Sequence, residues 1–96
     1  MLESTYQARL INRLSLMFPG GFVLKNDANY VQGILDLTIF NGPKWGMLEV
    51  KASERSKERP NQAYYVQMFN TMGFAAFIYP ENEEEVLNAL QEALRC

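Results

Sequence analysis

Hydrophobic residues near the start of the chain recur every three to four positions, which is the spacing of one face of a helix. This pattern predicts a helix over residues 4–18, whose apolar face is made by Tyr6, Leu10, Leu14 and Met17. Ser4 followed by Gln7 has the form of a capping box, so the helix is expected to start at this serine. The Pro-Gly-Gly run that follows Phe18 ends the predicted helix.

Two further helices and four strands are predicted by the same kind of pattern. The helices cover residues 60–72 and 83–95. The strands cover residues 22–27, 34–40, 45–51 and 74–79, with a hairpin turn at 41–44 and a polar loop at 52–59. The order α-β-β-β-α-β-α predicts one crossover unit in a mixed sheet with helices packed against it. The expected fold class is therefore α/β, in a single domain covering residues 1–96.

The hairpin of residues 34–51 is predicted to carry all of its charged side chains on one face. Alternate residues of a strand point to the same side of a sheet. Asp36 on the first strand and Glu49 and Lys51 on the second therefore fall on one side. The other side is purely aliphatic and is made by Leu35, Leu37, Ile39, Leu48 and Val50.

The turn at 41–44 also sets the expected register of this hairpin. It pairs Phe40 with Trp45 and Thr38 with Met47, which places Asp36 directly opposite Glu49. Directly opposed side chains have Cβ atoms about 4.5–5.5 Å apart, and like charges there destabilise a sheet. Either one carboxylate binds a proton or a cation lies between the two. The alternative is a solvated sheet face with incidental charges, although helices are expected to cover both faces.

Composition narrows the chemistry that these charges can support. The chain has no histidine and a single cysteine, Cys96, so it can form neither an internal disulfide nor a cysteine-based zinc site. Any metal must be held by oxygen atoms, which favours Mg²⁺, Mn²⁺ or Ca²⁺. Asp36 and Glu49, with the carbonyl of Val50, could hold one or two such ions against a phosphodiester. Lys51 could position or deprotonate the attacking water, or neutralise the transition state.

The charge and hydropathy of the chain limit the classes of partner that it can have. The net charge is −2, but residues 81–96 hold five Glu and one Arg, so the remainder of the chain is mildly basic. This distribution permits a polyanionic partner without strongly indicating one. Apolar runs are too short for a membrane span, and the first residues lack the features of a signal peptide. A soluble, intracellular protein without a membrane partner is expected.

Asp36, followed after a hairpin turn by Glu49-Val50-Lys51, resembles the PD-(D/E)XK nuclease superfamily. The "GILDLTIF…WGMLEVKAS" stretch looks most like the virus-type replication-repair nuclease (VRR-NUC) domains of phages, which resemble Holliday junction resolvases. The resemblance implies an αβββαβ restriction-endonuclease-like core with an added C-terminal helix. It implies that Asp36 and Glu49 bind Mg²⁺ or Mn²⁺ and that Lys51 is catalytic. Leu35 stands where the motif name has proline.

Two more site positions are implied by the resemblance. Members of the superfamily often add a glutamate from the first helix, and Glu3 is the only acid near that helix, just before its expected start. Glu3 is thus a further catalytic and metal-binding candidate. Gln62 matches a polar position near the start of the helix that follows the lysine strand. It is expected to point toward the sheet, either into the site or to a structural hydrogen bond with the backbone.

Basic residues supply the candidate DNA contacts. The loop that begins at Lys51 contains Arg55, Lys57 and Arg59. A row of basic side chains that contact DNA phosphates could continue from this loop to Arg9 and Arg13 on the first helix. In the alternative interpretation this loop is simply solvated, with Glu54 and Glu58 offsetting two of its charges.

The resemblance favours a divalent-metal-dependent endonuclease for branched, four-way junction DNA, in the cytoplasm of a bacterial or phage-infected cell. Two symmetric cuts need two sites, which implies a homodimer. Its aromatic interface candidates are Tyr6, Tyr30, Trp45 and Tyr64, among which the sequence does not choose. The alternatives are a duplex-nicking or restriction-like nuclease, an inactive nuclease-fold binding module, and a structural subunit that docks through the acidic helix 82–95.

Overall fold

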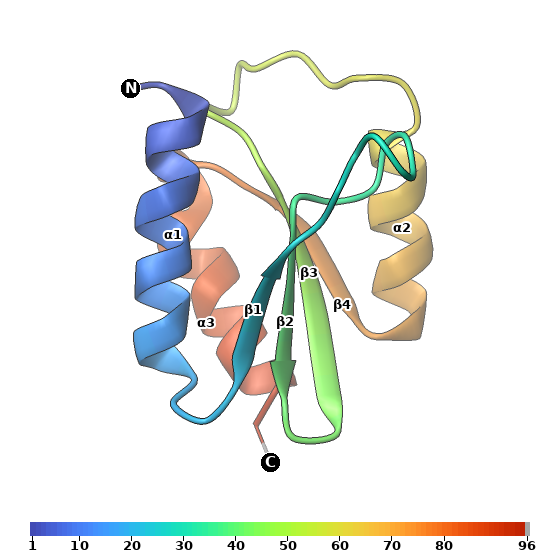
Figure 1. The fold of residues 1–96 in the computed structure, drawn as a ribbon. Coiled ribbons are helices and arrows are strands. Elements are labelled where there is room, and N and C mark those ends of the chain that lie inside the picture. The colour runs from blue at the N-terminus through green and yellow to red at the C-terminus, as the bar shows by residue number, and fades with distance from the viewer. Residues whose placement is uncertain (96) are drawn as a thin grey trace.

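In the computed structural model of the chain, a four-stranded sheet lies between helix α2 on one face and helices α1 and α3 on the other (Figure 1). Residues 1–95 are described, and Cys96, for which neither a disulfide nor a zinc site is predicted, lies outside them. The elements are α1 (Glu3–Met17), β1 (Phe22–Lys25), β2 (Leu37–Asn41), β3 (Lys44–Val50), α2 (Gln62–Met72), β4 (Phe74–Ile78), the 3₁₀ turn η1 (Pro80–Asn82) and α3 (Glu83–Ala93). Within the described chain, no helix combines the length and apolar character that crossing a membrane requires.

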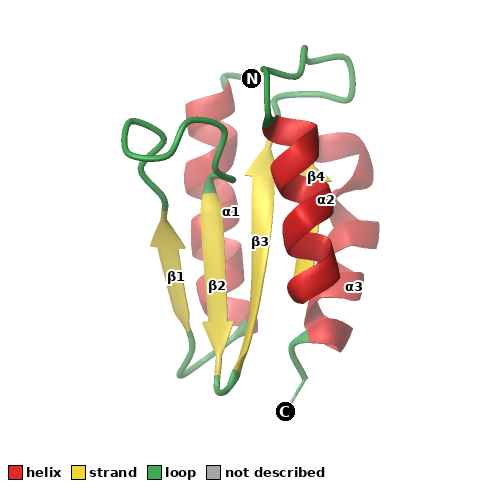
Figure 2. Ribbon diagram, turned by 90° about the vertical axis from the view of Figure 1, so that its right-hand side faces the viewer, coloured by secondary structure: helices red, strands yellow, loops and turns green. Residues whose placement is uncertain are grey.

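The strands lie in the order β1-β2-β3-β4 (Figure 2). β1 pairs with β2, and β2 with β3, in antiparallel fashion, whereas β3 and β4 are parallel and are connected through α2. A parallel pair needs such a crossover, because a tight turn can only reverse the chain. The predicted element order, mixed sheet, crossover unit and additional C-terminal helix are thus confirmed.

Each face of the sheet has its own hydrophobic core. The larger core joins the sheet to α1 and α3 through the predicted apolar stripes of both helices, and its members include Tyr6, Leu10, Leu14, Val86, Leu87, Leu90 and Leu94. The smaller core lies under α2, where Leu35, Met47 and Ala75 pack against Trp45, Tyr65, Val66 and Phe69. Because both faces are covered, a charged side chain in the middle strands has little access to water.

The hairpin has the predicted register, with Phe40 paired with Trp45 and Thr38 with Met47. Its turn is tighter than expected, because Asn41 and Lys44 also pair and leave two residues between them. The first of these, Gly42, has a φ of 60°, and glycine adopts such positive φ values without the steric cost that other residues incur. Two-residue hairpin turns depend on this property.

The second strand begins three residues later than predicted, at Leu37 rather than at residue 34. Asn26 explains the difference, since its main-chain N–H donates to the carbonyl of Asp36 at 2.8 Å and its side chain donates to the carbonyl of Leu35 at 2.8 Å. These bonds hold the chain in a loop rather than in the ladder. Leu35 therefore packs under α2, and its predicted place on the aliphatic face with Leu37 is wrong.

Two helix starts also differ from prediction. Helix α1 begins at Glu3 with Leu2 as its N-cap and no side-chain cap, so the capping box predicted at Ser4 does not form. The N–H of Tyr6 donates to the carbonyl of Leu2, which closes the first helical turn one residue early. Helix α2 begins at Gln62 rather than at residue 60, because the preceding residue, Asn61, has a left-handed conformation with a φ of 73°.

Candidate functional site

The candidate site lies at the end of the sheet where β3 ends and α2 begins. Loop 26–36 and loop 51–61 both project from this end of the molecule (Figure 1). Between them is a pocket of about 300 Å³, to which Asp36, Glu49 and Gln62 all contribute. Three residues that are far apart in the sequence thus share one cavity.

Gln62 joins the glutamate and the lysine of the predicted motif. Its amide nitrogen donates to Oε2 of Glu49 at 2.7 Å, and its amide oxygen accepts from Nζ of Lys51 at 2.6 Å. The same oxygen accepts from the main-chain N–H of Arg59 at 2.9 Å. Gln62 therefore has the predicted inward direction, with two side-chain partners and one backbone partner.

Lys51 is buried with only 5 % of its surface exposed, and its ammonium lies 4.0 Å from Glu49. As an ammonium it has three N–H donors. The Gln62 side chain and the carbonyl of Lys57, at 3.2 Å, accept from it. A solvated sheet face with incidental charges does not describe this buried cation and its neighbours.

One oxygen of Glu49 is buried without any hydrogen-bond partner among the described residues. The residue is 3 % exposed, and Oε1 is the atom concerned, while Oε2 is bonded to Gln62. A buried polar atom without a partner costs about 1–3 kcal/mol, and more when it is charged. A proton shared with Asp36, whose side-chain hydrogen bond also raises the pKa of Glu49, or a cation would reduce that cost.

Asp36 acts on Glu49, although it is not the ladder partner that the predicted register made it. The β2–β3 ladder ends at the Leu37–Leu48 pair, so Asp36 is not a ladder partner of Glu49. Instead its carboxylate accepts a hydrogen bond from the main-chain N–H of Val50 at 2.8 Å. Burial, and then the negative charge of Asp36, raises the pKa of Glu49 to about 8, while Lys51 acts in the opposite direction. The surroundings of Glu49 therefore favour its protonated, neutral form.

Glu3 lies near these groups without joining them. It is in the first turn of α1, on the opposite face of the sheet from α2, and it is not among the pocket residues. Its negative charge is nevertheless close enough to make the smallest contribution to the raised pKa of Glu49. The sequence-based position of Glu3 just before the helix is corrected to the first helical residue.

The oxygen atoms of the candidate site match part of what a hard divalent cation requires. Within residues 1–95, no group of three or more Asp, Glu, His or Cys side chains is arranged to hold a metal. Asp36 and Glu49 provide two carboxylates, and Mg²⁺ is commonly held by one or two carboxylates together with water and substrate phosphates. With the unpartnered Oε1 of Glu49, this set fits a cation that is shared with a phosphate rather than a fully caged metal. The carbonyl of Val50 remains a predicted ligand.

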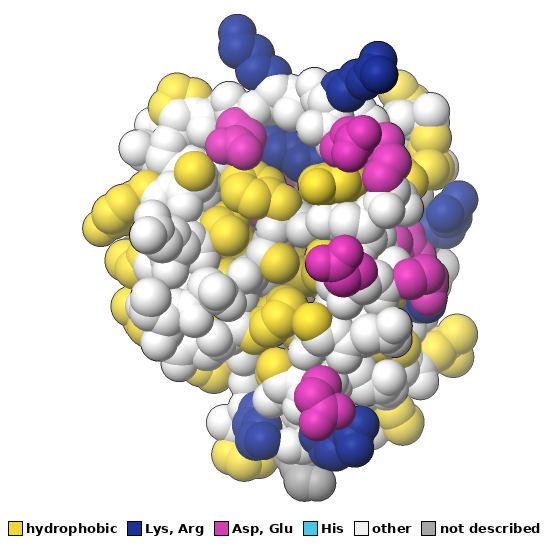
Figure 3. Space-filling view, turned by 180° about the vertical axis from the view of Figure 1, so that it is seen from behind, with side chains coloured by type: hydrophobic (Ala, Val, Ile, Leu, Met, Phe, Trp, Pro, Cys, Tyr) yellow, Lys and Arg dark blue, Asp and Glu magenta, His cyan; other side chains and the backbone are white. Residues whose placement is uncertain are grey.

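The predicted DNA-binding residues fall into two groups. Arg55, Lys57 and Arg59 are exposed in the loop between β3 and α2, and Arg59 also lines the site pocket. Lys and Arg side chains project from this upper end of the molecule in Figure 3. The charge of Arg13, in contrast, is compensated by ion pairs with two glutamates at the start of α3, and Arg9 lies over the ring of Tyr6. A DNA contact by Arg13 would require these ion pairs to open.

Sequence reasoning missed the contribution of loop 26–36. Ala28, Asn29, Gln32 and Gly33 of this loop line the site pocket. The segment contains polar and turn-forming residues, which predict a loop but not the direction in which it folds. The position of this loop depends on contacts with α2. The first residue of α2, Gln62, lies 30 positions after Gln32 in the sequence.

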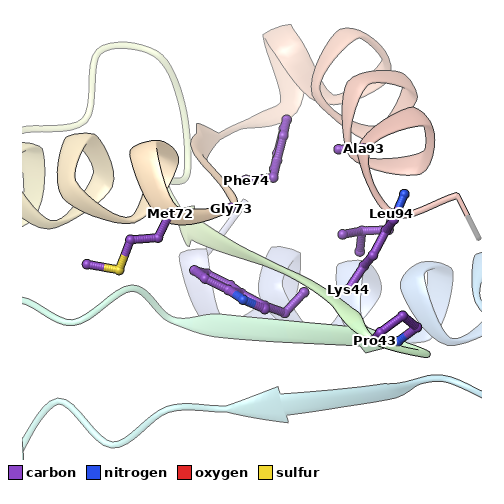
Figure 4. A pocket seen from close by; sticks show the side chains of 8 residues that line it. Pro43, Lys44, Met72, Gly73, Phe74, Ala93 and Leu94 are labelled. Carbon is purple, nitrogen blue, oxygen red and sulfur yellow. The ribbon is translucent and has the colours of Figure 1, made fainter.

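A second pocket, of about 340 Å³, lies at the opposite end of the sheet (Figure 4). It is lined by Pro43, Lys44, Trp45, Met72, Gly73, Phe74, Ala93 and Leu94. These residues include no carboxylate, and the ammonium of Lys44 donates to the main-chain carbonyl of Arg95 at 2.6 Å. This pocket does not offer the acid–base or metal chemistry of the first one.

No protein-family model matches the sequence, and no similar protein is found among curated proteins. The resemblance to PD-(D/E)XK nucleases stays a prediction from the sequence motif.

Gln62→Ala is expected to lower the free energy of unfolding by about 1–3 kcal/mol, because it removes partners from buried Glu49 and Lys51. Urea denaturation of the metal-free protein measures the effect. Gln67 is exposed on the same helix, and Gln67→Ala is the matched control, with a change within about 0.5 kcal/mol. Equal stability of the two variants would contradict a stabilising role for the buried network.

Proposed function

We propose that the protein is a divalent-metal-dependent DNA endonuclease of the PD-(D/E)XK type, most similar to VRR-NUC domains. The observation that carries the proposal is Oε1 of Glu49, a buried oxygen without a hydrogen-bond partner among the described residues. The other oxygen of the same carboxyl, Oε2, lies 4.0 Å from the Lys51 ammonium, and the negative charge of Asp36 acts on this carboxyl group. A buried carboxylate oxygen without a partner is uncommon in proteins and calls for an explanation. In this proposal the oxygen is protonated when no metal is bound, and a cation that enters with the substrate replaces the proton.

In the proposed reaction, a water oxygen forms a bond to phosphorus, and the bond from phosphorus to one sugar oxygen breaks. That oxygen leaves with a proton, so a phosphodiester and water become a phosphomonoester and a hydroxyl. Asp36 and Glu49 would hold Mg²⁺ or Mn²⁺, with Val50 and Glu3 as further candidates. When bound, the cation would polarise the phosphate and lower the pKa of a bound water.

In this proposal Lys51 acts on the phosphate group of the substrate, and Gln62 holds Lys51 and Glu49 in position. The ammonium of Lys51 places a positive charge beside the carboxylates, where it would offset charge that develops on the phosphate oxygens. Gln62 is a positioning residue, since it bonds both Lys51 and Glu49 and leaves each with little rotational freedom. Arg55, Lys57 and Arg59 are proposed to contact flanking phosphates.

The preferred substrate in this proposal is branched DNA, in the cytoplasm of a bacterial or phage-infected cell. Two symmetric cuts in a four-way junction require two copies of the site, so a homodimer is part of the proposal. Tyr6 is excluded as an interface residue because it is fully buried, and Trp45 packs against Phe69. Tyr30 and Tyr64 are exposed.

The wild-type protein is expected to cut a four-way junction in Mg²⁺ at least about tenfold faster than a linear duplex of the same arm sequences, and to cut neither in EDTA. Labelled strands resolved on denaturing gels measure both rates. Equal rates would overturn the junction preference and leave a duplex nuclease. The absence of cleavage with Mg²⁺ and with Mn²⁺ would overturn the proposed reaction in favour of a binding module.

A further inference from the structure

Loop 26–36, which connects β1 to β2, forms one wall of the site pocket. Asn29 and Gln32 of this loop face the same cavity as Asp36 and Glu49, and Arg59 contributes from the other loop. In Figure 1 the loop extends over the amino end of α2, at the end of the molecule where the site lies. Any polymer whose phosphate enters the pocket must therefore pass beside this loop.

Internal hydrogen bonds hold the loop in one shape. Asn26 bonds the main chain of Asp36 and the side chain of Thr38, at 2.8 and 2.9 Å. The Asp27 side chain accepts from the N–H of Asn29 at 2.8 Å, which forms a tight turn. At Gly33, where φ is 90°, a Cβ atom would meet Asn61 at 2.9 Å, so the loop is packed closely onto the start of α2.

Tyr30 lies at the exposed side of this loop. It is 89 % exposed, more than any other large hydrophobic residue that is described. Its neighbour Asn29 lines the pocket, and the N–H of Tyr30 donates to the carbonyl of Asp27 at 3.1 Å. The main chain is thus fixed while the ring lies in water, where it contributes almost nothing to the hydrophobic core. An aromatic ring presented in this way beside a polar pocket is suited to contact a flat ligand.

We infer that Tyr30 is a stacking platform for an unpaired nucleobase of the DNA whose phosphate lies in the pocket. The inference rests on the proposed function, because it takes the pocket as the place of the phosphate. Aromatic rings stack on bases of any sequence, but the base must first be free of its own partner. The side-chain amides of Asn29 and Gln32 can donate hydrogen bonds to phosphate oxygens of the adjacent DNA backbone. Tyr30 would therefore select DNA that is branched or locally unpaired over perfect duplex.

The test measures binding without cleavage, using Ca²⁺ in place of Mg²⁺ and fluorescence anisotropy with three DNAs: a four-way junction, a duplex with one unpaired base, and the perfect duplex. Tyr30→Ala is expected to weaken binding to the first two by about tenfold, which is about 1.4 kcal/mol, and to leave the perfect duplex unchanged. Tyr30→Phe keeps the ring and should keep the affinity. Phe22 is 62 % exposed at the distant end of β1, and Phe22→Ala is the matched control without effect.

Several results would overturn this inference. They are unchanged binding of all three DNAs by Tyr30→Ala, an equal loss on the perfect duplex, and a change of the variant's sedimentation that assigns the ring to an interface between two copies. The proposed function is scored separately by cleavage in Mg²⁺. A protein that selects the unpaired base through Tyr30 but cuts no DNA would contradict the hydrolysis alone. One that cuts DNA while Tyr30→Ala binds normally would contradict the stacking role alone.

Discussion

Replacement of Asp36 by alanine is expected to lower Mg²⁺-dependent cleavage of a four-way junction by about a thousandfold or more. Asp36 is one of only two carboxylates that line the described pocket, so its loss leaves Glu49 as the only carboxylate there. A bound divalent cation contributes several kcal/mol to the stabilisation of a hydrolytic transition state, and each 1.36 kcal/mol is a factor of ten in rate. Single-turnover cleavage measures the rate, and calorimetry with Mn²⁺ measures the loss of metal binding.

The fold should survive this change, because Asp36 is only half-buried and precedes β2. The lost bond to the N–H of Val50 is a modest cost. Glu85→Ala is the control, since this carboxylate is exposed on α3, on the face of the sheet away from α2. An Asp36→Ala variant that cleaves at the wild-type rate would refute the mechanism, whereas a variant that is unfolded by circular dichroism calls for Asp36→Asn as the replacement test.

Glu49→Gln is expected to remove a large pH dependence of stability. The pKa of Glu49 is raised to about 8 in the folded protein from an ordinary value of 4.5. Between these pH values the folded chain retains a proton that the unfolded chain releases. The free energy of unfolding of the wild-type protein therefore falls as the pH rises from about 4.5 to about 8, by up to about 5 kcal/mol. The glutamine variant cannot ionise, so it should not lose this stability.

Urea denaturation at pH 5, 7 and 9 in EDTA measures this difference, and Glu58→Gln in the exposed loop is the matched control. Addition of Mg²⁺ should restore stability to the wild-type protein at pH 9, because the cation binds the ionised carboxylates of the folded state. It should have much less effect on Glu49→Gln. If the free energy of unfolding of the wild-type protein were the same at pH 5 and pH 9, the ionisation of Glu49 would cost the folded protein little. That result would contradict the prediction.

Much of the fold could be predicted because its elements follow local rules. The apolar stripes of α1 and α3, the turn at Gly42 and the register of the hairpin depend on residues close together in sequence. The failures lie beside the candidate site. Asn26 ends the β2 ladder at Leu37 and sends Leu35 to the other core, through hydrogen bonds that span nine or more positions. Periodicity within one strand contains no information about such a partner.

The types and positions of the residues that are available at the candidate site could be identified from the sequence alone. The absence of histidine, the single cysteine and the positions of Asp36, Glu49 and Lys51 limit the site to carboxylates and one amine. Alternation along β3 placed Glu49 and Lys51 on one face, and the helical face of Gln62 directed it toward them.

The surroundings of these groups, in contrast, depend on tertiary packing. The packing of α2 over β3 removes water from Glu49, and its Oε1 atom then has no partner among the described residues. Loop 26–36 forms a wall of the pocket and leaves Tyr30 in solvent, because it packs against the start of α2. Desolvation depends on every segment that surrounds an atom, whereas a sequence pattern describes one segment at a time. For this reason a pair of carboxylates in a hairpin could be found from the sequence, but the burial of Glu49 and the missing partner of its Oε1 atom could not.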